Sequence, residues 1–215
     1  MTETPTLRFD GPDSAPVTVA LAHGAGVGWD SPFMTAMAEG LAAAGVRVAR
    51  FEFPYMARMR QTGGRRPPDT EATLLASFRA VVTELGNPER LILAGKSMGG
   101  RMATRLAADL HAEGTPAAGA AALGYPFHPP GKPQTLRIEH LQTIATPVLV
   151  VQGERDPFGT PEEMAAYRLA ETVRLHWEPD GDHHFVPRKT ASATQQANWA
   201  DAAKALAAFA REVAG

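Results

Sequence analysis

The chain has 215 residues, of which 44% are hydrophobic and 20% are charged. This composition excludes general disorder and predicts one packed domain spanning residues 1–215. Its 21 Lys and Arg against 23 Asp and Glu give a net charge of −2, so the chain offers no overall basic field for a nucleic acid or an anionic membrane. Cysteine is absent, which excludes disulfides, thiolate metal sites and thiol nucleophiles.

The N-terminal segment, residues 1–16, is polar and has no basic region followed by an apolar one, so no secretory signal is expected. Polar residues interrupt every apolar run well before the length of a membrane span. These features predict a soluble, cytoplasmic protein with no membrane partner. The sequence does not determine its oligomeric state.

Apolar β-branched runs alternate with segments of helical periodicity, a pattern typical of a mostly parallel sheet wound with helices on both faces. The expected strands are Val17–His23, Val46–Phe53, Arg90–Lys96, Ala118–Tyr125, Pro147–Gln152 and Val173–Glu178. The expected helices begin at Pro32 (after the N-cap Ser31), near Asp69, directly after Ser97 and near Ala191.

The most specific motif is Gly95-Lys96-Ser97-Met98-Gly99, a G-x-S-x-G pentapeptide. It follows an expected strand and opens an expected helix, which is the context of a nucleophile elbow. Small glycines allow the strand and the helix to pass close to a serine on a strained turn. Ser97 is therefore the candidate nucleophile.

A serine hydroxyl needs a base, and the base needs an acid that fixes its tautomer; in this motif's context the chain order is Ser, acid, His. Asp156 follows the strand Pro147–Gln152 and is the candidate acid, with Glu154 as its rival. His183 follows the strand Val173–Glu178 and is the candidate base, with His184 as the alternative. The adjacent histidines His183 and His184 have no third metal ligand nearby in the sequence, so no metal site is expected there.

Two backbone amides are expected to stabilise the oxyanion that forms during acyl transfer. One is the amide of Met98, directly after the serine, and the other is the amide of Ala25 in the loop His23-Gly24-Ala25-Gly26. We expect His23 to order that loop. The remaining histidines lie outside the order of a triad and are expected to be structural or exposed: His111, His128, His140 and His176.

With these motifs, the chain resembles an α/β-hydrolase along nearly its whole length. The segments Leu21–Gly26, Phe53–Met56, Pro67–Asp69 and Gly95–Arg101 resemble the hydrolase-like domain family that includes animal testis-expressed and chromatin-complex proteins and many bacterial proteins. It is similar, more distantly, to the dienelactone hydrolases. The resemblance implies Ser97, Asp156 and His183 as a catalytic triad, with the histidine in a His-x-Phe context, and it implies no cofactor.

Only His128 to Thr146 separate the fourth and fifth expected strands, which leaves little chain for a lid. We therefore expect a minimal α/β-hydrolase fold with an open, shallow site for short or flexible acyl substrates. Candidate walls of the site are Trp29, Tyr55, Met98 and Phe158, all expected on loops at the carboxyl edge of the sheet.

Residues 54–69 carry Arg58, Arg60, Arg65 and Arg66 and are expected to form a solvated loop. As an alternative, Arg65 and Arg66 could clamp an anionic substrate group, because a guanidinium matches carboxylate and phosphate geometry.

These observations predict a serine hydrolase that cleaves a small-molecule carboxylic ester or thioester. Two alternatives stay open: a non-catalytic binding or scaffold module on a hydrolase-like fold, and a related peptidase, acyltransferase or perhydrolase.

Overall fold

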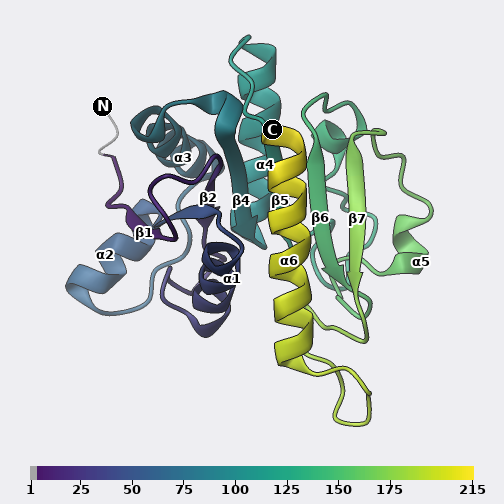
Figure 1. Ribbon diagram of the computed structural model, residues 1–215. Coiled ribbons are helices and arrows are strands. Elements are labelled where there is room, and N and C mark those ends of the chain that lie inside the picture. Colours follow the sequence, from purple (N-terminus) through teal and green to yellow (C-terminus); the bar gives the residue numbers. More distant parts are fainter. Residues whose placement is uncertain (1–3) are drawn as a thin grey trace.

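The computed structural model describes residues 4–215; residues 1–3, which belong to the predicted domain and N-terminal segment, lie outside the described residues. Seven strands form one sheet in the order β1-β3-β2-β4-β5-β6-β7 (Figure 1). All neighbouring pairs are parallel except β1 and β3, which are antiparallel. The predicted mostly parallel sheet is confirmed.

Six of the strands lie where their apolar runs predict them, within two residues at either end. Their bounds are β2 Thr18–Ala22, β3 Arg47–Phe51, β4 Leu91–Lys96, β5 Gly119–Leu123, β6 Val148–Gly153 and β7 Val173–Glu178. The seventh, β1 (Arg8–Asp10), was not predicted, because three residues with two charges among them carry no apolar run.

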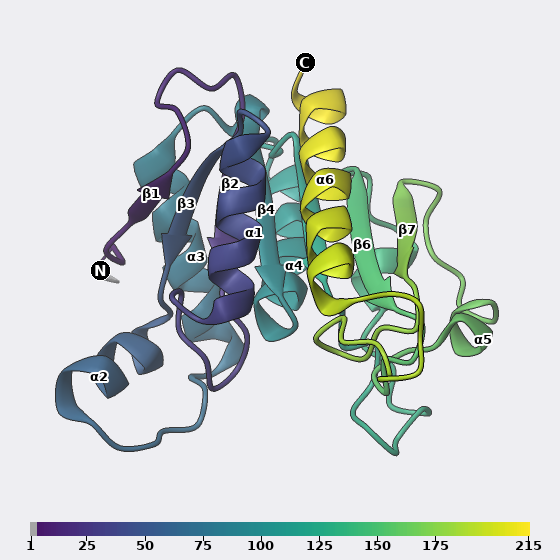
Figure 2. The same ribbon diagram turned by 60° about the horizontal axis from the view of Figure 1, so that its bottom comes forward.

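Helices cover both faces of the sheet. The long helices are α1 (Pro32–Ala43), α3 (Glu71–Leu85), α4 (Met98–Ala112) and α6 (Gln195–Ala214). Helices α1 and α6 lie side by side on one face, and α3 and α4 pack together on the other (Figures 1 and 2). The doubly wound arrangement is therefore as expected.

Successive side chains along a strand point to opposite faces of the sheet and pack into two separate hydrophobic layers. On β2, Val19 and Leu21 pack in the layer beneath α1 and α6, whereas Ala20 and Ala22 pack in the layer beneath α3 and α4. All four are fully buried. A strand that is buried on both faces appears in the sequence as a continuous apolar run, and this run is what predicted β2.

Two expectations about the helices are wrong, and one short helix was not expected. Residues 54–69 are not a solvated loop throughout: α2 spans Pro54–Thr62 and buries Tyr55 and Met56. This helix starts at Pro54, which occupies the first helical position. The Asp69 carboxylate accepts a hydrogen bond from the Tyr55 amide at 2.8 Å in the first turn.

The last helix begins at Gln195 rather than near Ala191, because Thr194 caps it. A four-residue helix, α5 (Pro161–Met164), was not predicted.

The segment between β5 and β6 is short, with a single 3₁₀ turn at Glu139–Gln142. Within it, the Tyr125 hydroxyl donates to the Arg137 carbonyl at 2.7 Å. The segment also packs on α4, where the Thr104 hydroxyl lies 2.9 Å from His140 Nε2. The expected absence of a substantial lid on a single-domain fold is thus confirmed. None of the described helices is long and apolar enough to cross a bilayer.

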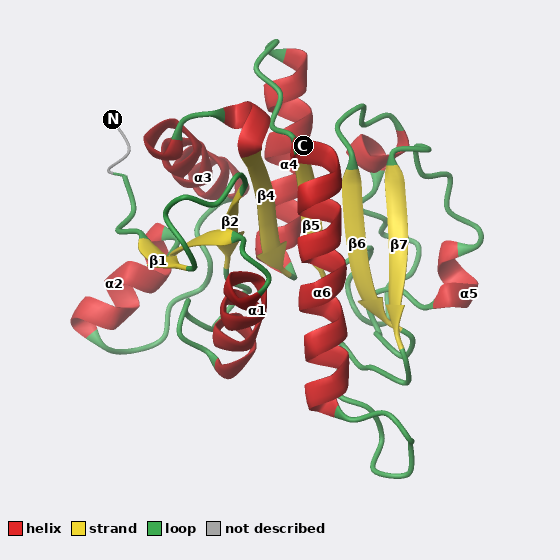
Figure 3. Cartoon of the chain, viewed as in Figure 1, coloured by secondary structure: helices red, strands yellow, loops and turns green. Residues whose placement is uncertain are grey.

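The parallel strands all end at one edge of the sheet, as the common direction of the arrowheads of β4, β6 and β7 shows (Figure 3). The chain segments that carry the candidate triad and oxyanion-hole residues follow β2, β4, β6 and β7 at this edge, and the segment with Tyr55, Arg65 and Arg66 follows β3. In open α/β sheets the crevice beyond these strand ends is the usual ligand site.

The unexpected strand β1 is held by a buried ion pair. Arg50 on β3 is 1% exposed and donates to both carboxylate oxygens of Asp10 at 2.8 Å, and its Nη1 donates to the Trp29 carbonyl at 3.0 Å. Near it, an exposed pair joins Arg47 to Asp13 at 3.4 Å, with the Asp13 side chain 92% exposed.

These two pairs predict losses of stability of very different size when the acid is removed. Asp10→Ala leaves a buried guanidinium without its counter-charge and should lower the free energy of unfolding by about 3 kcal/mol. Asp13→Ala should lower it by less than about 0.5 kcal/mol. Urea denaturation measures both, and equal effects would contradict this account of β1.

Candidate active site

Ser97 lies in a tight turn between the end of β4 and the first residue of α4. Its φ of 51° is in the left-handed region, where a non-glycine residue is strained. A Cβ added to Gly95 would lie 2.4 Å from the Gly99 carbonyl carbon, and one added to Gly99 would lie 2.6 Å from the Ala22 and His23 oxygens. Both glycines are therefore required for strand and helix to approach this closely.

His183 and Asp156 extend from Ser97 in a continuous chain of hydrogen bonds. The Ser97 hydroxyl lies 2.9 Å from His183 Nε2, and His183 Nδ1 lies 2.8 Å from Asp156 Oδ2. The Asp156 side chain is fully buried, whereas that of His183 is 15% exposed. With Nδ1 protonated and facing the carboxylate, Nε2 is free to accept the serine proton.

The two alternatives from the sequence do not join this chain of hydrogen bonds. Glu154 is exposed, and its Oε2 accepts from the Asp180 amide at 2.8 Å. His184 is exposed as well; its backbone amide donates to Asp182 Oδ1, and its carbonyl accepts from the Trp199 indole at 2.8 Å. The structure therefore brings Asp156 and His183, not Glu154 or His184, into line with Ser97.

The loop after β2 passes directly beside Ser97. A Cβ placed on Gly24 would lie 3.7 Å from Ser97 Cβ, and the next residue, Ala25, is exposed. Met98, whose amide follows the serine, opens α4, where amides have no partners within the helix. Both candidate donors of the oxyanion hole thus belong to segments that border Ser97.

His23 fixes the shape of this loop. It is fully buried, its Nε2 accepts from the Phe53 amide at 3.0 Å, and its Nδ1 lies 2.7 Å from the Gly24 carbonyl. This pairing requires the neutral ring with the proton on Nδ1, and burial lowers the pKa of His23. The Tyr55 hydroxyl accepts from the Gly26 amide at 3.3 Å and adds a second tie to the loop.

Lys96 holds the backbone of His183 in place. The sequence did not predict this role, although Lys96 lies inside the serine motif. Its side chain is buried, and Nζ donates to the His183 carbonyl at 2.6 Å. Burial lowers the pKa of Lys96 to about 7, and the charges of Asp156 and Asp182 oppose that shift. A lysine that ends an otherwise apolar strand is the only sequence signal for this role.

The side-chain amides of Gln152 and Asn198 also position the acid and the base, and neither role was predicted from the sequence. Gln152 Nε2 donates to Asp156 Oδ2 at 3.0 Å, while its Oε1 accepts from the Tyr125 amide at 2.7 Å. Asn198 on α6 donates to the carbonyls of Pro179 and Phe185 at 3.0 Å, at the two ends of the His183 loop. Both depend on contacts between distant parts of the chain.

The predicted wall residues fall into different places. Phe158 lies at the site: its ring centroid is 4.4 Å from that of His183, and its amide donates to Asp156 Oδ1 at 2.9 Å. Met98 is half-buried beside the serine. Tyr55 is on the first turn of α2, not on a loop, and is 1% exposed. Trp29 is half-buried, 5.8 Å from the Arg60 guanidinium, and lines a groove with Ala57 and Gln61.

The arginines of residues 54–69 divide into two pairs. Arg58 forms an ion pair with Asp69, and Arg60 pairs with Glu52 at 2.6 Å and Asp30 at 3.0 Å. Arg65 and Arg66 are exposed between α2 and α3, and within residues 4–215 neither forms an ion pair. Only the second pair has guanidinium groups available for an anion.

A family model described as "Alpha/beta hydrolase domain" matches residues 15–211. Among solved structures, a serine hydrolase without a lid from Xanthomonas campestris is 22% identical, with a TM-score of 0.68 over 96% of this chain and 88% of that one. A dienelactone hydrolase from Anabaena variabilis is 21% identical, with a TM-score of 0.71 over 96% and 91% of the two chains.

A third structure, Est1E from Butyrivibrio proteoclasticus with ferulic acid bound, is 17% identical, with a TM-score of 0.69 over 97% of this chain and 94% of that one. At these identities the three likenesses concern the fold alone. The family assignment depends instead on the match of the family model to most of the sequence. This chain belongs to the alpha/beta hydrolase domain family.

Proposed function

We propose that this protein is a serine hydrolase that cleaves carboxylic esters or thioesters, with Ser97, His183 and Asp156 as its triad. The observation that carries the proposal is the hydrogen-bond chain at 2.9 Å and 2.8 Å that joins a strained serine to a histidine and a buried carboxylate. Nucleophile, base and orienting acid in this order are what acyl transfer to serine requires.

In the proposed reaction, Ser97 Oγ attacks the substrate carbonyl carbon while His183 Nε2 takes the hydroxyl proton. Asp156 stabilises the imidazolium through Nδ1. The resulting oxyanion accepts hydrogen bonds from the amides of Met98 and Ala25. His183 then returns its proton to the departing alcohol or thiol, which leaves an acyl group on Ser97.

Water completes the cycle. His183 removes a proton from a water molecule, whose oxygen attacks the acyl carbon, and the same histidine reprotonates Ser97 Oγ as the carboxylic acid is released. No cofactor takes part in this sequence of steps. Lys96, Gln152 and Asn198 act as positioning residues, since each holds the backbone or the side chain of His183 or Asp156.

An open site favours small or flexible acyl substrates. Ser97 is half-buried, Ala25 beside it is exposed, and the connection between β5 and β6 is too short to form a large lid. Phe158, packed on the His183 ring, is the proposed apolar wall next to the acyl group. Trp29, Arg65 and Arg66 are proposed as more distant substrate contacts, whereas Tyr55, which is 1% exposed, is proposed to support the loop after β2 through its hydroxyl.

The finer family resemblance, to the hydrolase-like domains of testis-expressed and chromatin-complex proteins, stays a prediction, as does the cytoplasmic location. The same is true of the preference between esters and thioesters.

Hydrolysis of 4-nitrophenyl acetate tests the proposed triad. We expect Asp156→Asn to lower kcat by about 10⁴-fold, because the amide favours the wrong histidine tautomer. Ser97→Ala and His183→Ala should lose at least as much. Release of 4-nitrophenol, followed at a pH where the wild type is folded, gives the rates.

His184→Ala is the matched control, since it removes the adjacent and exposed imidazole. It should retain activity close to that of the wild type. The triad assignment would be contradicted if His184→Ala, and not His183→Ala, abolished turnover, or if Ser97→Ala hydrolysed the ester at the wild-type rate.

A second prediction concerns the exposed arginines. If Arg65 and Arg66 bind an anionic acyl group, changing either to Ala should raise KM for 4-nitrophenyl hemisuccinate about two- to fivefold, the worth of one exposed ion pair. KM for neutral 4-nitrophenyl butyrate should not change. Arg79→Ala, which removes an exposed arginine paired with Glu113, is the control. An equal rise in KM for both esters would count against an anion clamp.

A further inference from the structure

Glu178, the last residue of β7, has a buried carboxylate that accepts no hydrogen bond from residues 4–215. Its side chain is 0% exposed, and neither of its oxygens has a hydrogen-bond partner among the described residues. Burial and the charge of Asp201 raise the pKa of Glu178 to about 8. A carboxylate that loses its hydration without gaining a donor destabilises the fold unless a cation or a proton neutralises it.

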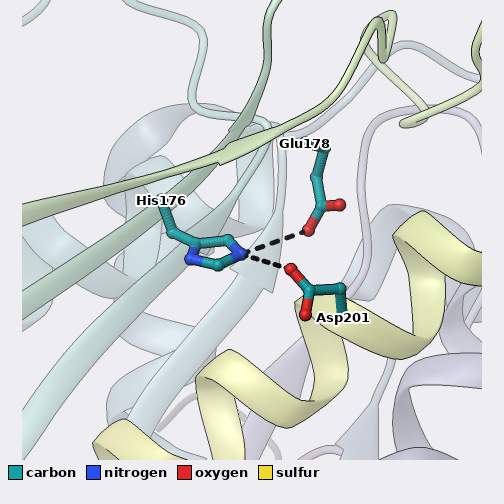
Figure 4. A group of neighbouring side chains, drawn as sticks. All are labelled: His176, Glu178 and Asp201. Carbon is teal, nitrogen blue, oxygen red and sulfur yellow. Dashed lines mark hydrogen bonds and ion pairs between the residues drawn. The ribbon is translucent and has the colours of Figure 1, made fainter. Parts of the chain in front are cut away.

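Two further ligand groups face this carboxylate. His176 lies two residues earlier on β7, on the same face of the strand, and its Nε2 is 3.8 Å from Glu178 Oε1. Asp201 on α6 places Oδ2 2.8 Å from the same imidazole nitrogen. Figure 4 shows the three side chains converging from the strand and the helix.

The spacing of the three groups is close to that of metal ligands. The three ligand atoms all lie within 4.8 Å of one another. A tetrahedral ion with bonds of about 2.0 to 2.1 Å separates its ligands by about 3.3 Å, and the distances of 2.8 Å and 3.8 Å lie on either side of that value.

We propose that His176, Glu178 and Asp201 form a binding site for a divalent transition-metal ion of the Zn²⁺ class. One imidazole and two carboxylates supply three ligands, which leaves the remaining position to water. The imidazole favours such ions over Mg²⁺ and Ca²⁺, which prefer oxygen ligands only. Because the side chains of His176 and Asp201 are 33% and 51% exposed, an ion can enter from solvent.

The site shares no residue with the proposed triad, and its role is structural. Glu178 lies five residues before His183, and Asp201 lies one turn after Asn198, whose amide holds both ends of the His183 loop. A bound ion would thus add a tie between α6 and β7 at the base of that loop. It would stabilise the folded protein without taking part in ester cleavage.

Calorimetric titration of chelator-treated wild-type protein with Zn²⁺ tests the proposal. We expect one saturable site per chain and, at 100 times its Kd, a rise in Tm of roughly 5 to 10 °C. His176→Gln, Glu178→Gln and Asp201→Asn should each weaken binding more than about 100-fold and remove the rise in Tm.

Glu178→Gln also separates a metal ligand from a residue that only packs. In the absence of metal this substitution replaces a buried carboxyl that accepts no hydrogen bond from the described residues with a neutral amide of the same shape, so the variant should be about as stable as the metal-free wild type. Its missing response to Zn²⁺ then cannot be ascribed to misfolding. If the substitution lowered the Tm of the metal-free protein and left Zn²⁺ affinity unchanged, Glu178 would be a packing residue and the proposal would be wrong.

Two controls locate the ion. Glu212→Gln removes an exposed acid from the same helix, and His184→Ala removes the exposed imidazole beside His183; both should bind Zn²⁺ like the wild type. The proposal would be overturned by the absence of saturable binding, by binding that survives in both His176→Gln and Asp201→Asn, or by binding that depends on His184.

Discussion

Where α4 crosses the ends of β2 and β4, backbone meets backbone with no room for a side chain. Added Cβ atoms at Gly95 and Gly99 would lie 2.4 Å and 2.6 Å from backbone atoms. This contact makes the chain turn within one residue, which is why Ser97 adopts a φ of 51°. Because the turn is fixed from both sides, the amide at the start of α4 and the loop after β2 come together beside a single hydroxyl.

The rest of the site depends on this fixed point through buried polar contacts. Gln152 ties the acid to the carbonyl edge of β5, Lys96 ties the base to the serine strand, and Asn198 ties the base's loop to the last helix. Each tie satisfies polar groups that would otherwise be orphaned within the protein, so the supports of the site also stabilise the fold. A rigid scaffold of this kind limits the histidine to one orientation.

Most of the sheet could be predicted, because strands buried on both faces appear as apolar runs and the helices between them have clear caps. Strand β1 could not, since its place depends on the Arg50 and Asp10 pair, 40 residues apart. Helix α2 was missed because its arginines indicate a solvated loop, whereas their partners Asp69, Glu52 and Asp30 come from other segments. Ser97 followed from a local motif, and Asp156 and His183 from chain order and strand ends. Lys96, Gln152 and the group around Glu178 depend on contacts that only the folded chain creates.

The proposed function requires that the hydroxyl of Ser97, activated by His183, is a nucleophile. A fluorophosphonate probe reacts covalently with such a serine, and the mass of the intact protein together with the mass of the modified peptide reports how many groups are attached and where. We expect one phosphonate per chain, located on Ser97, and none on folded Ser97→Ala. A folded wild-type protein that stays unlabelled, or a label on another residue, would contradict it.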